Sequence, residues 1–103
     1  MDFSYRYHAG ALVILPEGEI DQHSVSILKT EVDQLIGEGN ARELCFDLSR
    51  VTFMDSSGIG FLIGRYKKMA AAGGRVTLCG VQPQVDRVLS LSGIDQIIEK
   101  VRR

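Results

Sequence analysis

The chain has few of the residues that hold metal ions or form cross-links, with two cysteines and two histidines among its 103 residues. His8 and His23 are well separated in the sequence, so we expect no dedicated metal site. Cys45 and Cys79 fall in separate apolar runs, where we expect each to be an isolated core thiol. A cytosolic compartment would keep such thiols reduced.

The chain also lacks a strong net charge and a long apolar run. Twelve Lys and Arg against 13 Asp and Glu leave a formal charge of -1, which gives no electrostatic footprint for nucleic acid. Only the end of the chain, with Lys100, Arg102 and Arg103, is locally basic. Apolar stretches are interrupted before they reach the length of a membrane span, and residues 1–4 do not resemble a signal segment. We therefore expect a cytoplasmic protein that binds neither nucleic acid nor membrane.

The composition is that of an ordinary globular protein, with 45% apolar and 24% charged residues. A chain of 103 residues is long enough for one compact core and too short for two. We expect residues 1–103 to form a single domain.

The first half of the chain predicts a hairpin, a helix and a strand. Apolar and polar residues alternate over 3–8, Gly10 allows a reversal, and 11–15 is a second strand with Pro16 at its end. Asp21 is a good N-cap for a helix whose apolar residues recur at helical spacing until Gly37 and Gly39. The apolar run over 44–54 is expected to be a strand that leads into a polar loop.

The second half predicts two further helices on the same sheet. One helix starts at Ser57 and closes at Gly73-Gly74, and a strand over 76–79 precedes a helix over 82–91 with Pro83 in its first turn. A short strand near Ile97-Ile98 is possible. This order predicts an α/β fold with a mixed, mostly parallel sheet of four to five strands and helices packed on it.

The polar loop Asp55-Ser56-Ser57-Gly58 is the most informative motif. Two hydroxyls lie next to an acid where a helix begins, and no His or Lys within the loop could activate them. One serine can cap the helix, which stabilises it by roughly 1 kcal/mol. The other is then free, and helix N-terminal N–H groups suit a phosphate. The loop therefore favours a serine that is modified over one that catalyses.

Two catalytic interpretations of this region are weaker. A serine hydrolase needs a base beside the serine, and the G-x-S-x-G turn is absent, although His8 or His23 approaching in space would leave a dyad open. Gly58, Gly60 and Gly64 are spaced G-x-G-x-x-x-G, which fails the dinucleotide fingerprint, and no Walker loop occurs. We expect no cofactor, and we expect Gly60 and Gly64 to let their helix lie close to the sheet.

Asp21 has a structural and a functional interpretation. The residue alone favours helix capping. However, the segments 18–21 and 55–58 each follow a strand and precede a helix, so an α/β layer would bring them to one edge of the domain.

At these two loops the chain resembles the STAS-domain anti-sigma factor antagonists, and the resemblance covers nearly the whole chain. The matching stretches are Gly18-Glu19-Ile20-Asp21, Phe53-Met54-Asp55-Ser56-Ser57-Gly58-Ile59-Gly60, Gly64-Arg65-Tyr66-Lys67, Gly73-Gly74 and Ser92-Gly93-Ile94. The run through Gly64-Arg65-Tyr66-Lys67 is more similar to the sporulation sigma-F branch than to the general stress branch.

The resemblance implies a protein that is not an enzyme but a phosphorylation switch. It implies that Ser56 accepts phosphate from an ATP-bound anti-sigma factor serine kinase and that a metal-dependent serine phosphatase removes it. The unphosphorylated form would bind the kinase and release a sigma factor. The residues implied to bind the partner are Asp21, Asp55, Ser57, Gly58 and Ile59. An alternative is a STAS subunit of a larger signalling assembly.

The end of the sequence departs from the family pattern. Family members usually carry a further helix after the last strand, and only about nine residues follow Ile94. We expect that helix to be absent from this sequence or reduced to a turn.

Overall fold

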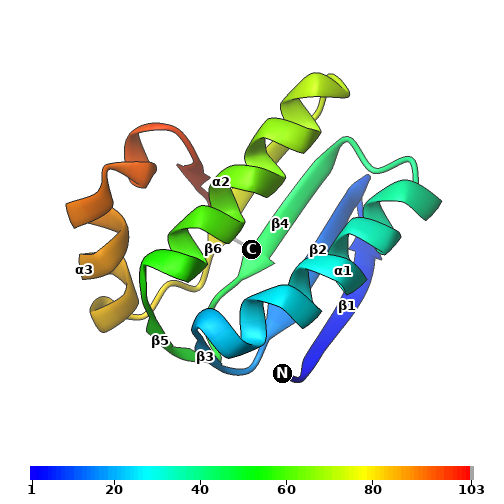
Figure 1. Ribbon diagram of the computed structural model, residues 1–103. Helices are drawn as coiled ribbons and strands as arrows, with labels where there is room; N and C mark the ends of the chain where they lie inside the picture. Colours follow the sequence, from blue (N-terminus) through cyan, green and yellow to red (C-terminus); the bar gives the residue numbers. More distant parts are fainter. Residues whose placement is uncertain (103) are drawn as a thin grey trace.

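The computed structural model describes residues 1–102 and combines a mixed sheet with three α-helices (Figure 1). The strands are β1 (Phe3–His8), β2 (Ala11–Pro16), β3 (Gly18–Ile20), β4 (Glu43–Asp47), β5 (Val51–Met54), β6 (Arg75–Cys79) and β7 (Glu99–Lys100). The helices are α1 (Gln22–Glu38), α2 (Ser56–Ala71) and α3 (Pro83–Ser92), followed by a 3-10 turn over Ile94–Gln96. The predicted hairpin and helices are confirmed.

The main sheet has five strands in the order β1-β2-β4-β6-β7. The β1–β2 hairpin is antiparallel, and every other neighbouring pair in this sheet is parallel. The α/β prediction of a mixed, mostly parallel sheet is therefore confirmed. The short last strand is also confirmed, but it lies at Glu99–Lys100, two residues later than expected.

Helices α1 and α2 lie side by side across one face of this sheet (Figure 1). The core between the two layers is apolar, as the helical spacing predicts. Its largest fully buried side chains include Leu12, Ile14, Leu28, Leu44, Phe46, Leu62, Leu78 and Leu89. Removing this much apolar surface from water is the main stabilising contribution to the fold.

The opposite face of the sheet carries a second, smaller apolar cluster. It consists of Ala11, Val13, Cys45 and Cys79, with Leu15 and Val101 packed against it. The two thiols are in contact, with 3.6 Å between their Sγ atoms. Our expectation of isolated thiols is therefore wrong, because the β4–β6 register brings together two residues that are 34 positions apart in the sequence.

The apolar run over 44–54 is not one strand. It forms β4 in the main sheet and then β5, which leaves that sheet and pairs in parallel with β3 in a separate two-stranded sheet. Between them, Leu48 N–H bonds to Cys79 C=O and Val51 N–H bonds to Leu48 C=O, which turns the chain. We had expected residues 18–20 to be a loop, and they are β3.

The glycines of α2 also differ from expectation. Gly60 and Gly64 face open space, since a Cβ added to either would meet nothing within 4 Å. Gly58 is the close-packing position, where an added Cβ would lie 2.4 Å from Met54 Cγ and 3.1 Å from Ile20 Cγ2. The prediction for Gly60 and Gly64 is wrong, and the first turn of α2 rests on the β3–β5 pair through Gly58.

None of the helices within residues 1–102 is both long and apolar enough to cross a membrane.

Candidate functional site

The β3–β5 pair brings the starts of α1 and α2 together. Ile20 and Met54 are partners in its register, and Asp55 N–H donates to Ile20 C=O at 3.4 Å. Asp21 and Asp55 come directly after these two residues. The expectation that the two loops share one edge of the domain is confirmed, although through a separate small sheet (Figure 1).

Asp21 is the N-cap of α1, as predicted. Its Oδ1 accepts hydrogen bonds from the backbone N–H groups of His23 and Ser24, both at 3.0 Å. Ser24 Oγ in turn accepts from Asp21 N–H at 3.0 Å, which completes a capping box. The bond from the Ser24 backbone N–H stabilises the ionised carboxylate and lowers the pKa of Asp21 below its usual 3.8.

Asp55 performs the same task for α2. Its Oδ1 accepts from Ser57 N–H at 2.8 Å and from Gly58 N–H at 3.4 Å. We had expected a serine hydroxyl to cap this helix and α2 to begin at Ser57. Both expectations are wrong, because the carboxylate one residue earlier takes the cap and α2 begins at Ser56.

Neither serine hydroxyl forms a hydrogen bond to another group of residues 1–102. Ser56 is exposed at the first position of α2, and Ser57 is half-buried at the second. The two serines thus differ in access to a partner. The Ser56 hydroxyl can accept a group delivered from outside the molecule, and no His or Lys side chain of the described chain is bonded to it as a base.

The surroundings of Ser56 combine acidic and apolar groups. Phe53, two residues before Asp55, leaves 46% of its surface exposed, and Ile59 is half-buried in the first turn of α2. Glu19 lies opposite Phe53 in the β3–β5 register and is exposed. Gly58, which the resemblance implies to be a partner-binding residue, is buried, so its effect on such a surface comes through packing.

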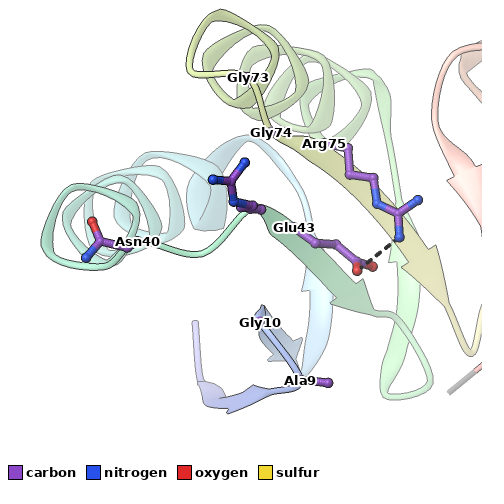
Figure 2. Close-up of a pocket in the computed structure, with 8 residues that line it drawn as sticks. Ala9, Gly10, Asn40, Glu43, Gly73, Gly74 and Arg75 are labelled. Atoms are coloured by element: carbon purple, nitrogen blue, oxygen red, sulfur yellow. Dashed lines mark hydrogen bonds and ion pairs between the residues drawn. The ribbon is translucent and has the colours of Figure 1, made fainter.

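A cavity lies at the other end of the sheet (Figure 2). It measures about 500 Å³ and is lined by Ala9, Gly10, Asn40, Arg42, Glu43, Gly73, Gly74 and Arg75. Glu43 Oε1 bonds to Arg75 there at 3.3 Å, at the starts of β4 and β6. This cavity therefore does not include the Ser56 loop.

Nothing in residues 1–102 groups three or more His, Cys, Asp or Glu side chains where they could hold a metal ion.

The fold and the site define a small α/β domain that presents a polar helix start at one end of its sheet. The STAS domain family model matches residues 3–103, and the chain belongs to this family. An anti-sigma F factor antagonist of Paenibacillus polymyxa is 33% identical over 98 residues, which cover 95% of this chain and 84% of that protein. An anti-sigma-B factor antagonist of Bacillus subtilis is 30% identical over 82 residues, covering 80% of this chain and 73% of the relative.

Solved structures agree with this membership. The unphosphorylated anti-sigma factor antagonist SpoIIAA superposes with a TM-score of 0.83 at 29% identity, covering 97% of this chain and 88% of that one. The phosphorylated form of the Bacillus cell fate determinant SpoIIAA superposes with a TM-score of 0.73 at 28% identity, covering 97% and 91%. A relative of the same fold is thus known in both phosphorylation states.

Proposed function

We propose that this protein is an anti-sigma factor antagonist that is switched off by phosphorylation of Ser56. In its unphosphorylated form it binds an anti-sigma factor that is also an ATP-dependent serine kinase, and the bound sigma factor is released. A metal-dependent serine phosphatase restores the active form. The protein acts in the cytoplasm as a regulator and not as an enzyme.

One observation carries the choice of Ser56. Asp55 caps α2, so the Ser56 hydroxyl is free of intramolecular bonds and exposed at the first helical position. Ser57 is half-buried, and its backbone N–H donates to Asp55 Oδ1 at 2.8 Å, so its hydroxyl is less accessible to a partner. The relatives named above support the partner class, since several are named as antagonists of anti-sigma factors.

The transfer step needs little from this chain beyond position. Ser56 Oγ attacks the γ-phosphorus of ATP held by the kinase, the bond to the β,γ-bridging oxygen breaks, and ADP leaves. The hydroxyl proton passes to a base of the kinase. A short helix start resting on a packed β-pair holds the hydroxyl in one place, and such positioning supplies much of the catalysis in phosphoryl transfer.

The phosphate then weakens the complex by its charge. It adds about -1.5 to -2 charge units at neutral pH beside the carboxylates of Asp21 and Asp55. In the complex, the phosphate on Ser56 faces the phosphates of the nucleotide that the partner holds. Repulsion between these like charges weakens binding. The fold itself need not change.

The test is incubation with the cognate anti-sigma kinase and ATP, followed by mass spectrometry of the peptide spanning residues 55–65. We expect one phosphate on Ser56, none in Ser56→Ala, and a phosphate that remains on Ser56 in the matched variant Ser57→Ala. Phosphate on Ser57 alone, or on neither serine, would contradict the proposal.

Two further measurements separate the alternatives. An enzyme with a Ser56 nucleophile would be labelled by a fluorophosphonate in the absence of any partner. A STAS subunit of a larger assembly would elute as a stable oligomer with its partners whether or not Ser56 is phosphorylated. We expect neither result.

A further inference from the structure

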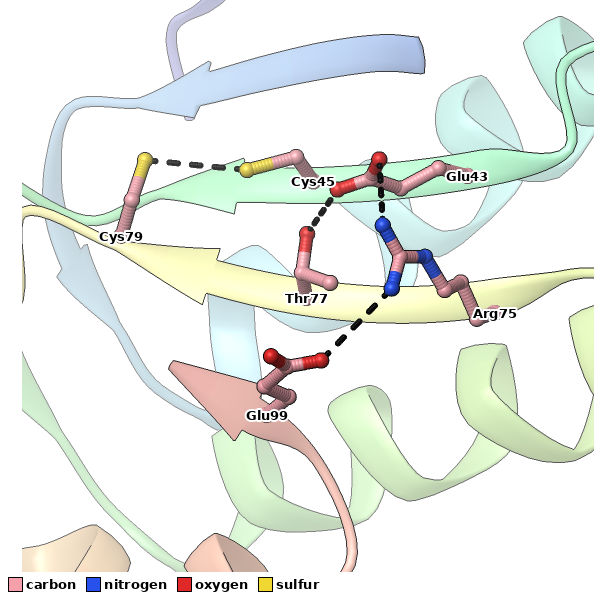
Figure 3. A network of polar contacts seen from close by, with 6 residues as sticks. All are labelled: Glu43, Cys45, Arg75, Thr77, Cys79 and Glu99. Atoms are coloured by element: carbon pink, nitrogen blue, oxygen red, sulfur yellow. Dashed lines mark hydrogen bonds and ion pairs between the residues drawn. The ribbon is translucent and has the colours of Figure 1, made fainter. Parts of the chain in front are cut away.

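The contacting cysteines, on the face of the sheet opposite α1 and α2, form a second chemically distinct site. Cys45 lies within β4 and Cys79 is the last residue of β6. Both are buried, and their Sγ atoms are 3.6 Å apart (Figure 3). The site is separate from the Ser56 loop and takes no part in the function proposed above.

The register of β4 and β6 determines how the two cysteines lie relative to each other. Cys45 is the partner of Thr77, and Cys79 is the partner of Asp47, so the thiols meet diagonally across the strands. A disulfide has an S–S bond of about 2.0 Å, so the sulfur atoms must approach by rotation of the side chains and a small shift of the strands. Cys79 is followed by Gly80 at φ +64, outside the regular strand.

Two side chains cover the thiols, and one of them belongs to the short segment that follows β7. Leu15 and Val101 pack against the cluster, and Val101 follows the two-residue strand β7. Val101 N–H bonds to Leu78 C=O at 2.7 Å, and Lys100 forms an exposed ion pair with Asp86. Short edge pairings with few buried contacts open at lower free energy than the core, which gives small molecules access to the sulfur atoms.

We propose that Cys45 and Cys79 are a reversible oxidation site that forms a disulfide with a hydroperoxide as oxidant. One thiolate attacks the peroxide O–O bond and becomes a sulfenic acid, while the leaving oxygen is protonated to water or an alcohol. The second sulfur then attacks the sulfenic sulfur, and the displaced hydroxide takes a proton to become water. With hydrogen peroxide, two thiols yield one disulfide and two molecules of water.

The diagonal geometry makes this bond easy to reduce. A bond that pulls two adjacent strands out of their register has a higher reduction potential than a structural disulfide, and it is opened by low-molecular-weight thiols. The resting state in a reducing compartment is the dithiol. Oxidation links β4 to β6 next to the Leu48–Cys79 backbone bond, at the point where the chain turns toward β5.

The experiment treats the folded protein with hydrogen peroxide, quenches it with a thiol-alkylating reagent and measures the intact mass. We expect a loss of two hydrogens, no alkylation, and a proteolytic peptide pair joined through Cys45 and Cys79. Reduced glutathione should restore both alkylation sites. Unreacted thiols, oxygen added without a cross-link, or a disulfide that forms only in denaturant would overturn the proposal.

Three variants sharpen the result. Cys45→Ala should retain oxygen on Cys79 and form no intramolecular bond, whereas a loss of two hydrogens in this variant would refute the pairing.

Val101→Ala removes part of the cover over the thiols and should speed disulfide formation several-fold. The matched control is Ile97→Ala, at a half-exposed position outside the cluster. This variant should form the disulfide at the same rate as the native chain. Equal rates in all three proteins would show that the segment does not control access.

Discussion

At the starts of α1 and α2, the carboxylate of a single aspartate caps each helix. Asp21 and Asp55 each satisfy two backbone N–H groups that would otherwise lack a partner. Because the carboxylates do this work, no hydroxyl is needed as a cap on α2. A free serine at the first position of α2 is thus a consequence of the residue before it.

Replacement of Asp55 tests this division of roles. Asp55→Ala removes the cap of α2, and we expect unfolding in urea to show a loss of about 1 kcal/mol. Asp55→Asn keeps an acceptor oxygen and should lose less. Ser57→Ala is the control, since its hydroxyl makes no bond and its removal should change stability little. A cost for Ser57→Ala equal to that of Asp55→Ala would show that the hydroxyl takes part in the cap.

The pKa of Asp21 gives a pH-dependent prediction. Because folding lowers this pKa below 3.8, the carboxylate contributes stability above that pH, and the contribution is lost as the pH falls through the folded pKa. Asp21→Asn keeps a capping oxygen that does not titrate. We therefore expect the free energy of unfolding of the native chain to fall more steeply than that of Asp21→Asn between pH 5 and pH 2, measured by urea titration. Parallel curves would contradict the assignment.

The sequence pattern predicted Asp21 as a cap because it lies where a helix pattern begins, whereas the choice of Ser56 over Ser57 as the candidate acceptor came from the family resemblance. The pattern did not identify Asp55 as the cap of α2. Aspartate and serine are equally good N-caps, so a run of Asp-Ser-Ser offers three starting points for the helix. Which residue caps the helix depends on the hydrogen bond that Asp55 N–H donates to Ile20 C=O on another strand.

At the scale of elements, the position of α2 depends on one glycine. Gly58→Ala would place a Cβ against Met54 and Ile20, both of which are buried. We expect this overpacking to cost about 1–3 kcal/mol and to lower the rate of phosphate transfer to Ser56, because the first turn of α2 must move. Circular dichroism and urea unfolding measure the first effect, and the kinase assay measures the second.

Gly60→Ala is the matched control in the same helix. A Cβ there meets nothing within 4 Å, so the substitution should stabilise the protein by about 0.5–1 kcal/mol and leave phosphate transfer unchanged. If Gly58→Ala and Gly60→Ala behaved alike, close packing at Gly58 would not position the loop.

The elements that sequence patterns predicted are those with local signals. Helices α1 and α3 begin at a cap or at Pro83 and end at glycine, and β1 and β2 join through Gly10. Strand β3 has three residues and exists only through its pairing with β5, more than 30 positions later. No local pattern can report such a pairing, and for the same reason the contact between Cys45 and Cys79 was not foreseen.

Sequence patterns also missed that a charged residue, Arg65, lies on the buried face of α2. Arg65 is buried against α1, where its Nε lies 3.0 Å from Asp33 Oδ1 and its guanidinium lies 5.1 Å from the centre of the Phe61 ring. A charged residue on an apolar stripe is normally assigned to the solvent side. Here its ion pair joins the two helices whose starts form the candidate site.

At the scale of the whole molecule, the proposed switch is a change of charge on a fixed scaffold. The chain has a formal charge of -1, and a phosphate adds about two further negative charges beside Asp21 and Asp55. Ser56 is exposed at a helix N-terminus, where an anion is favoured by about 0.3–1 kcal/mol. Repulsion from the two neighbouring carboxylates opposes this gain, so we expect Ser56→Asp to unfold at nearly the same denaturant concentration as Ser56→Ala.

Binding to the anti-sigma kinase should separate the two variants. Ser56→Asp places a carboxylate where the partner holds nucleotide phosphates, so its dissociation constant should exceed that of Ser56→Ala. The ratio of the two constants should shrink as salt rises from about 0.1 M to about 1 M, because the screening length falls from about 10 Å to about 3 Å. Calorimetric titration at several ionic strengths, with nucleotide held constant, measures this ratio. Equal affinities would exclude charge as the switch, and a ratio that does not change with salt would assign the effect to steric exclusion instead.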